Sequence, residues 1–316
     1  MMRRIGQMGI VTLLLSLVLT GCAPAGYQHN QGLVFGTVYN ITYQSADNLQ
    51  EEIEAELRKV DAEFSMFNEQ STVSRLNRGE QVDTSAMFSE IYRLAQTVSR
   101  ETYGAFDITV APLVNAWGFG FKHEQIPTPQ QVDSLLQVRH QMDFSAIAKG
   151  YGCDVVARLL ESRGITNYMV EIGGEVVLHG QSPSQSDWRI GVTKPTADTV
   201  AVAGEVYSVL TMTDLAMATS GNYRNFYDKD GRRYAHTIDP RTGYPVQHSL
   251  LSATVVAADC ATADAYATSF MVLGLDSARM VLERHPELGA YLIYSDEQGQ
   301  MQVWHSPALS DKLMTP

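Results

Sequence analysis

The sequence has few cysteines, and it lacks the motifs of the common metal hydrolases and nucleotide-binding loops. Three cysteines in 316 residues are too few for a disulfide framework. Cys153 and Cys260 do not have the spacing of metal ligands, and we interpret them as small buried residues, although a single bridge between them stays open. No HExxH motif, Cys/His cluster or Walker A loop occurs, so a zinc hydrolase or a P-loop NTPase is not supported.

Basic residues are also scarce. The chain has 23 Lys and Arg against 35 Asp and Glu, a formal charge of −12. Because affinity for nucleic acid comes mainly from Lys and Arg, this balance argues against a nucleic-acid partner. Hydrophobic residues make up 45% of the chain and charged residues 18%, which is typical of a globular protein and excludes a disordered or fibrous one.

Residues 1–21 resemble the signal peptide of a bacterial lipoprotein. Arg3 and Arg4 precede an apolar run, 10–18, that is too short to span a bilayer comfortably. The run leads into Leu19-Thr20-Gly21-Cys22, which resembles a lipobox. We expect cleavage before Cys22 and acylation of its thiol, so that the acyl chains hold the protein on a membrane. The alternative is an ordinary secretory signal with a chance cysteine.

After the signal peptide we expect a lipidated flexible tether over 22–31 and one domain over 32–316. Helical and extended patterns follow without an internal repeat, and no long polar linker marks a boundary. Several strands succeed one another directly, which favours an α+β fold over a doubly wound sheet. The pattern predicts helices at 48–64, 88–98, from Thr128-Pro129, 148–163, 262–273 and 277–283, strands at 168–179, 188–193, 206–213 and 250–257, and a terminal hairpin at 290–294 and 302–304.

Two glycine-containing motifs suggest close approach of a ligand. The first is DFSAIAKGY at 143–151, in which small side chains precede Lys149. The positive charge of Lys149 could bind an anionic ligand there. Alone this signal is weak, because Lys-Gly near a helix start is common. Gly173 and Gly174 interrupt a β-rich run, which indicates either a bulge or a ligand lying against the backbone.

Asp107 and His236 are each open to a structural interpretation. Asp107 ends GAFD, 104–107, where it either caps a turn or accepts hydrogen bonds from a ligand. His236 begins HTIDPRTG, 236–243, beside a rigid Asp-Pro turn. A lone histidine is more often structural than catalytic, but its position in a loop keeps catalysis open.

Asp264 and Thr268 are the most suggestive pair. They lie four residues apart on a predicted helix, so a carboxylate and a hydroxyl share one face. Hard oxygen ligands of this kind suit Mg²⁺, which completes its octahedron with waters and substrate phosphates. For an isolated pair of this type, a plain polar helix face is the simpler interpretation.

Together these motifs resemble the ApbE family of FAD:protein FMN transferases over about 32–274. Their order is a lipobox, F-S-M-F at 64–67, G-A-F-D, D-F-S-A-I-A-K-G, the glycine pair, S-G-N-Y at 220–223, H-T-I-D-P-R-T-G and A-D-A-Y-A-T at 263–268. The resemblance implies a single α+β domain of T-fold-like type, with mixed sheets flanked by helices.

The resemblance also implies a site. Mg²⁺ would be held by Asp264, Thr268 and the backbone carbonyl of Ala146. FAD, the substrate, would contact Phe35, Phe67, Ala105, Phe106, Asp107, Asp143, Lys149 and Ile238. Phe67 departs from relatives that often carry Tyr or another polar residue there, and a phenyl ring stacks but does not hydrogen-bond.

The implied reaction moves FMN from FAD to a Ser or Thr hydroxyl of an acceptor protein and releases AMP. His236 is the candidate general base, because an imidazole takes up a proton near neutral pH. The acceptors implied by the family are membrane electron-transfer subunits with a short Ser/Thr flavinylation motif. The alternatives are a Mg²⁺-dependent FAD pyrophosphatase, a non-catalytic lipid-anchored FAD-binding protein, and a role in thiamine synthesis, which no residue here supports.

Location follows from the anchor and the acceptors. Ala23 after Cys22 allows the outer membrane, since Asp at that position commonly retains lipoproteins at the inner membrane. A tether of about nine residues reaches only ~30 Å, too short to bring an outer-membrane enzyme to inner-membrane acceptors. We therefore expect the periplasmic side of the inner membrane, with the outer membrane left open.

Overall fold

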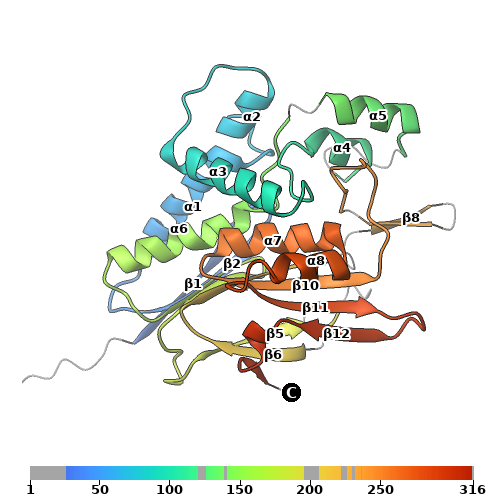
Figure 1. The fold of residues 1–316 in the computed structure, drawn as a ribbon. Helices are drawn as coiled ribbons and strands as arrows, with labels where there is room; N and C mark the ends of the chain where they lie inside the picture. Colours follow the sequence, from blue (N-terminus) through green and yellow to red (C-terminus); the bar gives the residue numbers. More distant parts are fainter. Residues whose placement is uncertain are drawn as a thin grey trace, which may run out of the picture.

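The chain forms a large antiparallel sheet that has helices on one face and a small sheet on the other (Figure 1). The computed structural model describes residues 26–119, 126–138, 141–195, 206–221, 226–229, 232–235 and 237–314. The eight strands of the large sheet, in spatial order, are β1 (Tyr27–Val34), β2 (Thr37–Gln44), β3 (Tyr168–Ile172), β4 (Glu175–His179), β7 (Leu215–Gly221), β10 (Leu250–Ala257), β11 (Gly289–Ser295) and β12 (Met301–His305).

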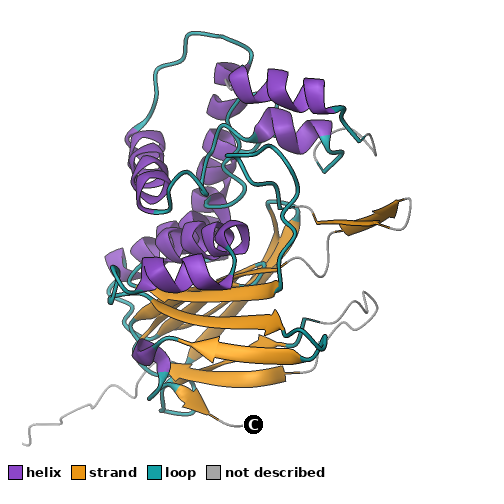
Figure 2. Cartoon of the chain, turned by 45° about the vertical axis from the view of Figure 1, so that its right-hand side comes forward, coloured by secondary structure: helices purple, strands orange, loops and turns teal. Residues whose placement is uncertain are grey.

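The small sheet closes the opposite face. It has the order β13 (Leu313–Met314), β6 (Val206–Met212) and β5 (Trp188–Thr193). Trp188, Leu210 and Met212 point into a core shared with Val176 and Ile293 of the large sheet. A separate ribbon, β8 (Phe226–Lys229) with β9 (Arg232–Ala235), projects from the body (Figure 2).

The helices form two layers above the large sheet (Figures 1 and 2). The inner helices pack on the strands, and the outer helices lie over them. The helices are α1 (Gln50–Phe64), α2 (Thr72–Asn77), α3 (Ala86–Glu101), α4 (Ala111–Ala116), α5 (Pro129–Gln137), α6 (Ala148–Ser162), α7 (Cys260–Leu273) and α8 (Leu275–Leu282). Within the described residues, no helix is both long enough and apolar enough to cross a membrane.

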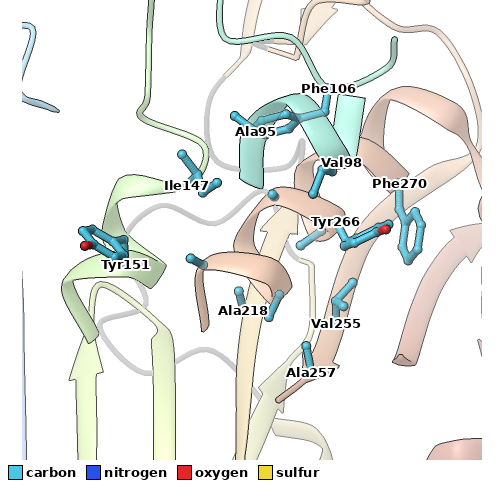
Figure 3. Close-up of a cluster of buried hydrophobic side chains, with 14 of the residues drawn as sticks. Ala95, Val98, Phe106, Ile147, Tyr151, Ala218, Val255, Ala257, Tyr266 and Phe270 are labelled. Carbon is cyan, nitrogen blue, oxygen red and sulfur yellow. The ribbon is translucent and has the colours of Figure 1, made fainter. Parts of the chain in front are cut away.

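The main core lies between these helices and the sheet. Figure 3 shows Phe106, Tyr151, Tyr266 and Phe270 in this cluster, with small residues such as Ala218 facing them from the sheet. Phe270 is fully buried, and burial of such a ring contributes roughly 1.5–3 kcal/mol. The many alanines on α7 leave room for this helix to approach the strands closely.

The helical predictions are confirmed. In α1 the apolar residues at helical spacing, Ile53, Leu57, Val60 and Phe64, are all buried. Thr128 caps α5 as expected, and Gln131 completes a capping box with it. The expected α+β architecture is present, and each described strand pairing is antiparallel, where we expected mixed sheets.

Two predictions need correction. The run 168–179 is not one strand but the hairpin of β3 and β4. Gly173 and Gly174 form its turn with φ of +63° and +104°, values that residues with a Cβ rarely adopt. Residues 27–31, expected in the tether, belong to β1 and pair with β2. Their polar side chains fit an edge strand that has one wet face.

Candidate functional site

Helices α6 and α7 each cap the other's first turn. Asp264 Oδ2 on α7 accepts a hydrogen bond from the Gly150 N–H of α6, at 3.1 Å. Asp154 on α6 accepts bonds from the Cys260 N–H at 2.8 Å and the Ala261 N–H at 2.9 Å, in the first turn of α7. Both carboxylates therefore meet the positive end of a helix dipole, where anions are stabilised.

Gly150 makes this close approach possible. A Cβ on Gly150 would lie 2.3 Å from the Cys260 carbonyl oxygen, a backbone atom that no side-chain rotation moves aside. The glycine after Lys149 is thus required by packing between the helices. The contact places Lys149, at the start of α6, next to Asp264 on α7.

Lys149 lies between two buried carboxylates, Asp264 and Glu175. Its ammonium forms an ion pair with Glu175 Oε1 at the start of β4. Burial opposes the charge of Lys149, but Asp264 and Glu175 outweigh burial and raise its pKa. Burial raises the pKa of Glu175, and the ammonium of Lys149 opposes that rise. Burial likewise raises the pKa of Asp264 against the opposing effects of Lys149 and the Gly150 N–H.

The carboxylate charge of this cluster is not fully compensated. Two carboxylates share one ammonium, and Glu175 Oε2 is buried without a hydrogen-bond partner. Buried acceptors of this kind are uncommon and costly. A divalent cation beside Asp264 would supply the missing positive charge, so the residues present fit a metal.

The predicted metal ligands come from two segments that the fold brings together. Asp264 and Thr268 share one face of α7, and Ala146 lies in the turn that leads into α6. Thr268 Oγ1 is 3.1 Å from Ser220 Oγ at the end of β7, which orients the hydroxyl. Within the part of the chain that the structure describes, no group of three or more His, Cys, Asp or Glu side chains is arranged to hold a metal. One carboxylate, a hydroxyl and a carbonyl are instead the ligand types of Mg²⁺.

Asp107 and Asp143 lie on adjacent segments and fix their own turns. The Asp143 N–H donates to the Ile108 carbonyl at 2.6 Å, which joins the two motifs. Asp107 Oδ1 accepts from the Thr109 N–H and hydroxyl, and Asp143 Oδ1 accepts from the Ser145 N–H at 2.8 Å. The capping interpretation of Asp107 is therefore confirmed. Ala105 and Phe106, just before it, are buried in the core.

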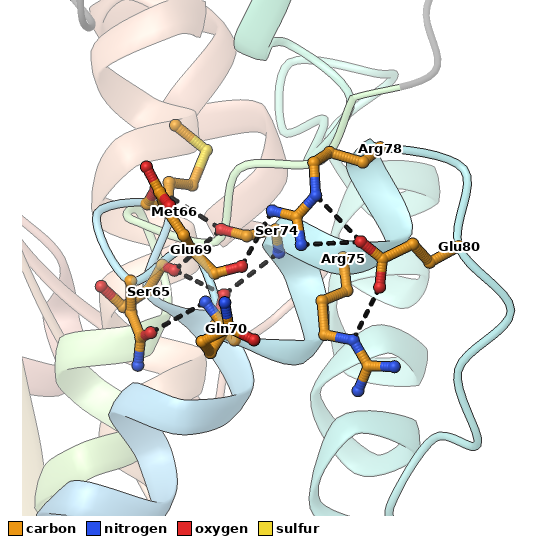
Figure 4. Close-up of polar contacts among 10 residues, drawn as sticks. Ser65, Met66, Glu69, Gln70, Ser74, Arg75, Arg78 and Glu80 are labelled. Carbon is orange, nitrogen blue, oxygen red and sulfur yellow. Dashed lines mark hydrogen bonds and ion pairs between the residues drawn. The ribbon is translucent and has the colours of Figure 1, made fainter.

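Phe35 and Phe67 occupy two different turns. Phe35 lies at the tip of the β1–β2 hairpin with φ of +51°, and its ring packs against Gly152 of α6. Phe67 follows α1 and is 80% exposed. The Phe67 loop, residues 65–71, is tied to α2 because the Ser65 carbonyl accepts bonds from the Ser71 and Ser74 hydroxyls (Figure 4). The Phe67 ring is thus exposed on a loop that these bonds hold in place.

A cavity of about 310 Å³ lies beside the Phe67 loop. Lys149, Asp264 and Thr268 do not line it. It therefore adjoins the segments of predicted FAD contacts and is separate from the charged cluster. Its lining residues are Met66, Glu69, Ser74, Asn77, Arg78, Ala111, Asn115 and Gln141.

Ile238 belongs to a small apolar cluster with Leu113 of α4, Trp117 directly after α4, and Val132 of α5. The turn after it is held by Trp117 Nε1, which donates to the Gly243 carbonyl at 2.8 Å. This anchoring keeps the segment next to His236 in a fixed place. His236 itself lies outside the described residues, as does Cys22.

The two remaining cysteines are free and buried. Cys153 and Cys260 lie in α6 and at the first residue of α7. Burial raises the pKa of both thiols, which keeps them protonated and unreactive. Their interpretation as small buried residues is confirmed.

Sequence reasoning missed three residues of this site. Glu175 partners Lys149, Ser220 orients Thr268 and Asp154 caps α7. Each acts on a residue far away in sequence, so only the fold reveals the pairing. Two of the three lie in motifs that the sequence does show: Glu175 ends E-I-G-G-E at 171–175, and Ser220 begins S-G-N-Y at 220–223.

Residues 35–292 match the ApbE family along most of the chain. This chain belongs to the ApbE family. It is 36% identical to the FAD:protein FMN transferase of Haemophilus influenzae, over 92% of this chain and 93% of that protein. It is also 36% identical to that of Vibrio cholerae, over 92% and 94%.

Solved ApbE structures have the same fold. The flavin transferase ApbE from Vibrio cholerae superposes with a TM-score of 0.81 at 35% identity, covering 92% of this chain and all of that one. The apo flavinyl transferase ApbE of Pseudomonas stutzeri gives 0.80 at 30% identity, covering 92% and 98%. The family resemblance and the expected fold are therefore confirmed.

Proposed function

We propose that this ApbE-family chain is an FAD:protein FMN transferase, which moves FMN from FAD to a Ser or Thr hydroxyl of an acceptor protein and releases AMP. The observation that carries the proposal is the ammonium of Lys149, ion-paired with Glu175 and within electrostatic range of the buried Asp264, at the junction of α6 and α7. Cleavage of a pyrophosphate is assisted by a metal ion and a positively charged side chain that bind the phosphates together. Its relatives are named for this transferase activity.

Asp264, Thr268 and the Ala146 carbonyl would hold Mg²⁺. The uncompensated carboxylate charge and the orphan oxygen of Glu175 support a cation in this cluster. When bound, the metal would withdraw charge from the pyrophosphate and so ease loss of AMP. Lys149 adds a fixed positive charge for the same phosphates.

The chemical step needs a base and an aligned nucleophile. The acceptor hydroxyl attacks the FMN phosphorus, a new P–O bond forms, and the P–O bond to AMP breaks. His236 takes the hydroxyl proton. The anchored turn from Ile238 to Gly243, in the same sequence motif as His236, supports this role.

The FAD contacts that we propose are spread over several turns and helix ends. Phe67 presents an exposed ring for stacking on the flavin, and Phe35 borders α6 near Lys149. The hydrogen bond between the turns of Asp107 and Asp143 brings the G-A-F-D motif next to the D-F-S-A-I-A-K-G motif. The remaining contacts are Ala105, Phe106 and, through its backbone, Ile238.

Incubation with FAD, Mg²⁺ and an acceptor carrying a Ser/Thr flavinylation motif tests the proposal. We expect the intact mass of the acceptor to rise by one FMN phosphoester, with one AMP released for each acceptor modified. Free FMN with no mass change would instead indicate a pyrophosphatase. FAD binding without AMP release would indicate a carrier.

The exposed ring gives a test of binding. Phe67→Ala removes a stacking surface, and we expect FAD affinity to fall about tenfold, since stacking on an aromatic ring contributes roughly 1–3 kcal/mol. The melting temperature is expected to stay unchanged, because the ring is 80% exposed. Fluorescence titration with FAD measures the affinity. Leu33→Ala, at a side chain 82% exposed, serves as the control, and an equal loss in both variants would contradict the assignment.

We also propose that Cys22 carries a lipid that holds the protein on the periplasmic side of the inner membrane, where membrane electron-transfer subunits would be its acceptors. A Cys22→Ser variant is expected to incorporate no labelled palmitate, because the lipid is attached to the thiol. It would be released as soluble protein or remain uncleaved on its signal peptide. Label still present in the variant would overturn the lipobox interpretation.

A further inference from the structure

Glu175 is a buried carboxylate whose role the proposed reaction does not yet use. It is 2% exposed, lies directly after the Gly173–Gly174 turn, and has one oxygen on Lys149 and the other unpartnered. Burial of a charged carboxylate costs more free energy than a single ion pair with a partly exposed lysine usually contributes. Stability alone does not account for a carboxylate in this position.

The position of Glu175 is fixed by the sheet. Strand β4 pairs with β3 on one side and β7 on the other. The Glu175 carbonyl also accepts a hydrogen bond from Cys153 Sγ at 3.3 Å. Lys149 and Cys153 are four residues apart on α6, so one helix face contacts Glu175 twice. The carboxylate is fixed by the sheet and the lysine side chain is flexible. The ion pair with Glu175 therefore sets the position of the Lys149 ammonium.

Lys149 has a second carboxylate within electrostatic range, Asp264. Asp264 is also the carboxylate proposed to bind Mg²⁺. An ammonium that paired with Asp264 would compete with the metal for the same oxygens. Lys149 must be close enough to help bind the pyrophosphate and still leave Asp264 accessible.

We propose that Glu175 is a positioning residue that holds Lys149 away from Asp264 and so keeps the metal ligand available. The inference rests on the proposed function for the metal at Asp264 and for the identity of the substrate. In Glu175→Gln the ammonium loses its anionic partner. Lys149 then pairs with Asp264, and divalent metal binds more weakly.

A double-mutant cycle tests this role. Binding of Mn²⁺ to the mature protein without FAD, followed by electron paramagnetic resonance, provides a readout independent of activity. We expect Glu175→Gln to weaken Mn²⁺ binding about tenfold, the scale of losses when residues behind a metal ligand are changed. In a Lys149→Met background, where no ammonium competes, the same substitution is expected to have little effect.

The matched control is Glu171→Gln. Glu171 lies on β3 of the same hairpin and bonds Asn40 and the Gly174 N–H, away from Lys149. Glu171→Gln removes the same negative charge as Glu175→Gln, and we expect it to leave Mn²⁺ binding unchanged. Equal weakening by Glu175→Gln in both backgrounds would overturn the inference, because it would show a simple loss of negative charge.

The outcomes separate this inference from the proposed function. If the wild-type protein transfers no FMN but the cycle is non-additive, the positioning role stands and the transferase proposal fails. If the wild-type protein transfers FMN and the cycle is additive, the reverse holds. Thermal unfolding of all four proteins in the cycle verifies that each is folded when Mn²⁺ is added.

Discussion

Asp264→Asn is expected to abolish FMN transfer at ordinary Mg²⁺ concentrations. The amide removes the only carboxylate among the proposed metal ligands, and loss of metal assistance costs several kcal/mol of transition-state stabilisation, or roughly 10²–10³-fold in rate. The fold is expected to persist, because the amide oxygen can still accept the Gly150 N–H bond. Transfer to an acceptor, measured by intact mass over a Mg²⁺ series, provides the test.

Asp259→Asn is the matched control on the same helix. Asp259 caps α7 by accepting the Thr262 N–H at 2.8 Å, and Asn is an equally good cap. We expect its transfer rate to remain near that of the wild-type protein. Unchanged transfer by Asp264→Asn would refute the metal assignment, and equal loss in both variants would point to damage to the helix.

Gly150→Ala is expected to be the most destabilising single-methyl change in the site. The new Cβ would lie 2.3 Å from the Cys260 carbonyl oxygen and 2.9 Å from the Ala261 nitrogen, so helices α6 and α7 must separate. We expect a loss of about 3 kcal/mol in unfolding free energy, as overpacking against backbone costs 1–3 kcal/mol or more. The melting temperature would fall by roughly 6–12 °C.

Gly152→Ala, two residues further along α6, makes the same chemical change in a softer place. Its Cβ would meet the Phe35 ring, a side chain that can rotate. Alanine also has higher helix propensity than glycine by about 1 kcal/mol. The net change in unfolding free energy is expected to be about 1 kcal/mol or less. Equal melting temperatures for the two variants would contradict the role of Gly150 in helix packing.

The helices, and the position of Asp264 and Thr268 on one of them, could be predicted from the sequence because their signals are local. Ile53, Leu57 and Val60 mark one buried face at helical spacing, and Asp264 and Thr268 lie one turn apart. Local signals also explain the failure at 168–179. Periodicity cannot tell one long strand from a hairpin, and the glycine pair was interpreted as a bulge or a ligand contact, not as a turn.

The ion pair of Lys149 with Glu175 could not be predicted in the same way. The two residues are 26 positions apart, on different elements, and no pattern in either segment names the other. Strand β1, at the edge of the sheet, was missed because most of its residues are polar, and β2 was missed because its buried residues do not alternate strictly with exposed ones. Such pairings depend on which strands become neighbours, which the fold decides as a whole.

The mutual capping of α6 and α7 has a consequence for the order in which the protein becomes competent. The bonds join residues separated by 114 and 106 positions. Loop closure over that distance must come before either helix start is satisfied. During synthesis, the segment with Lys149 therefore emerges long before the residues that complete its surroundings. Neither half can form the junction of α6 and α7 alone, so a partly made chain would lack the charged cluster around Lys149.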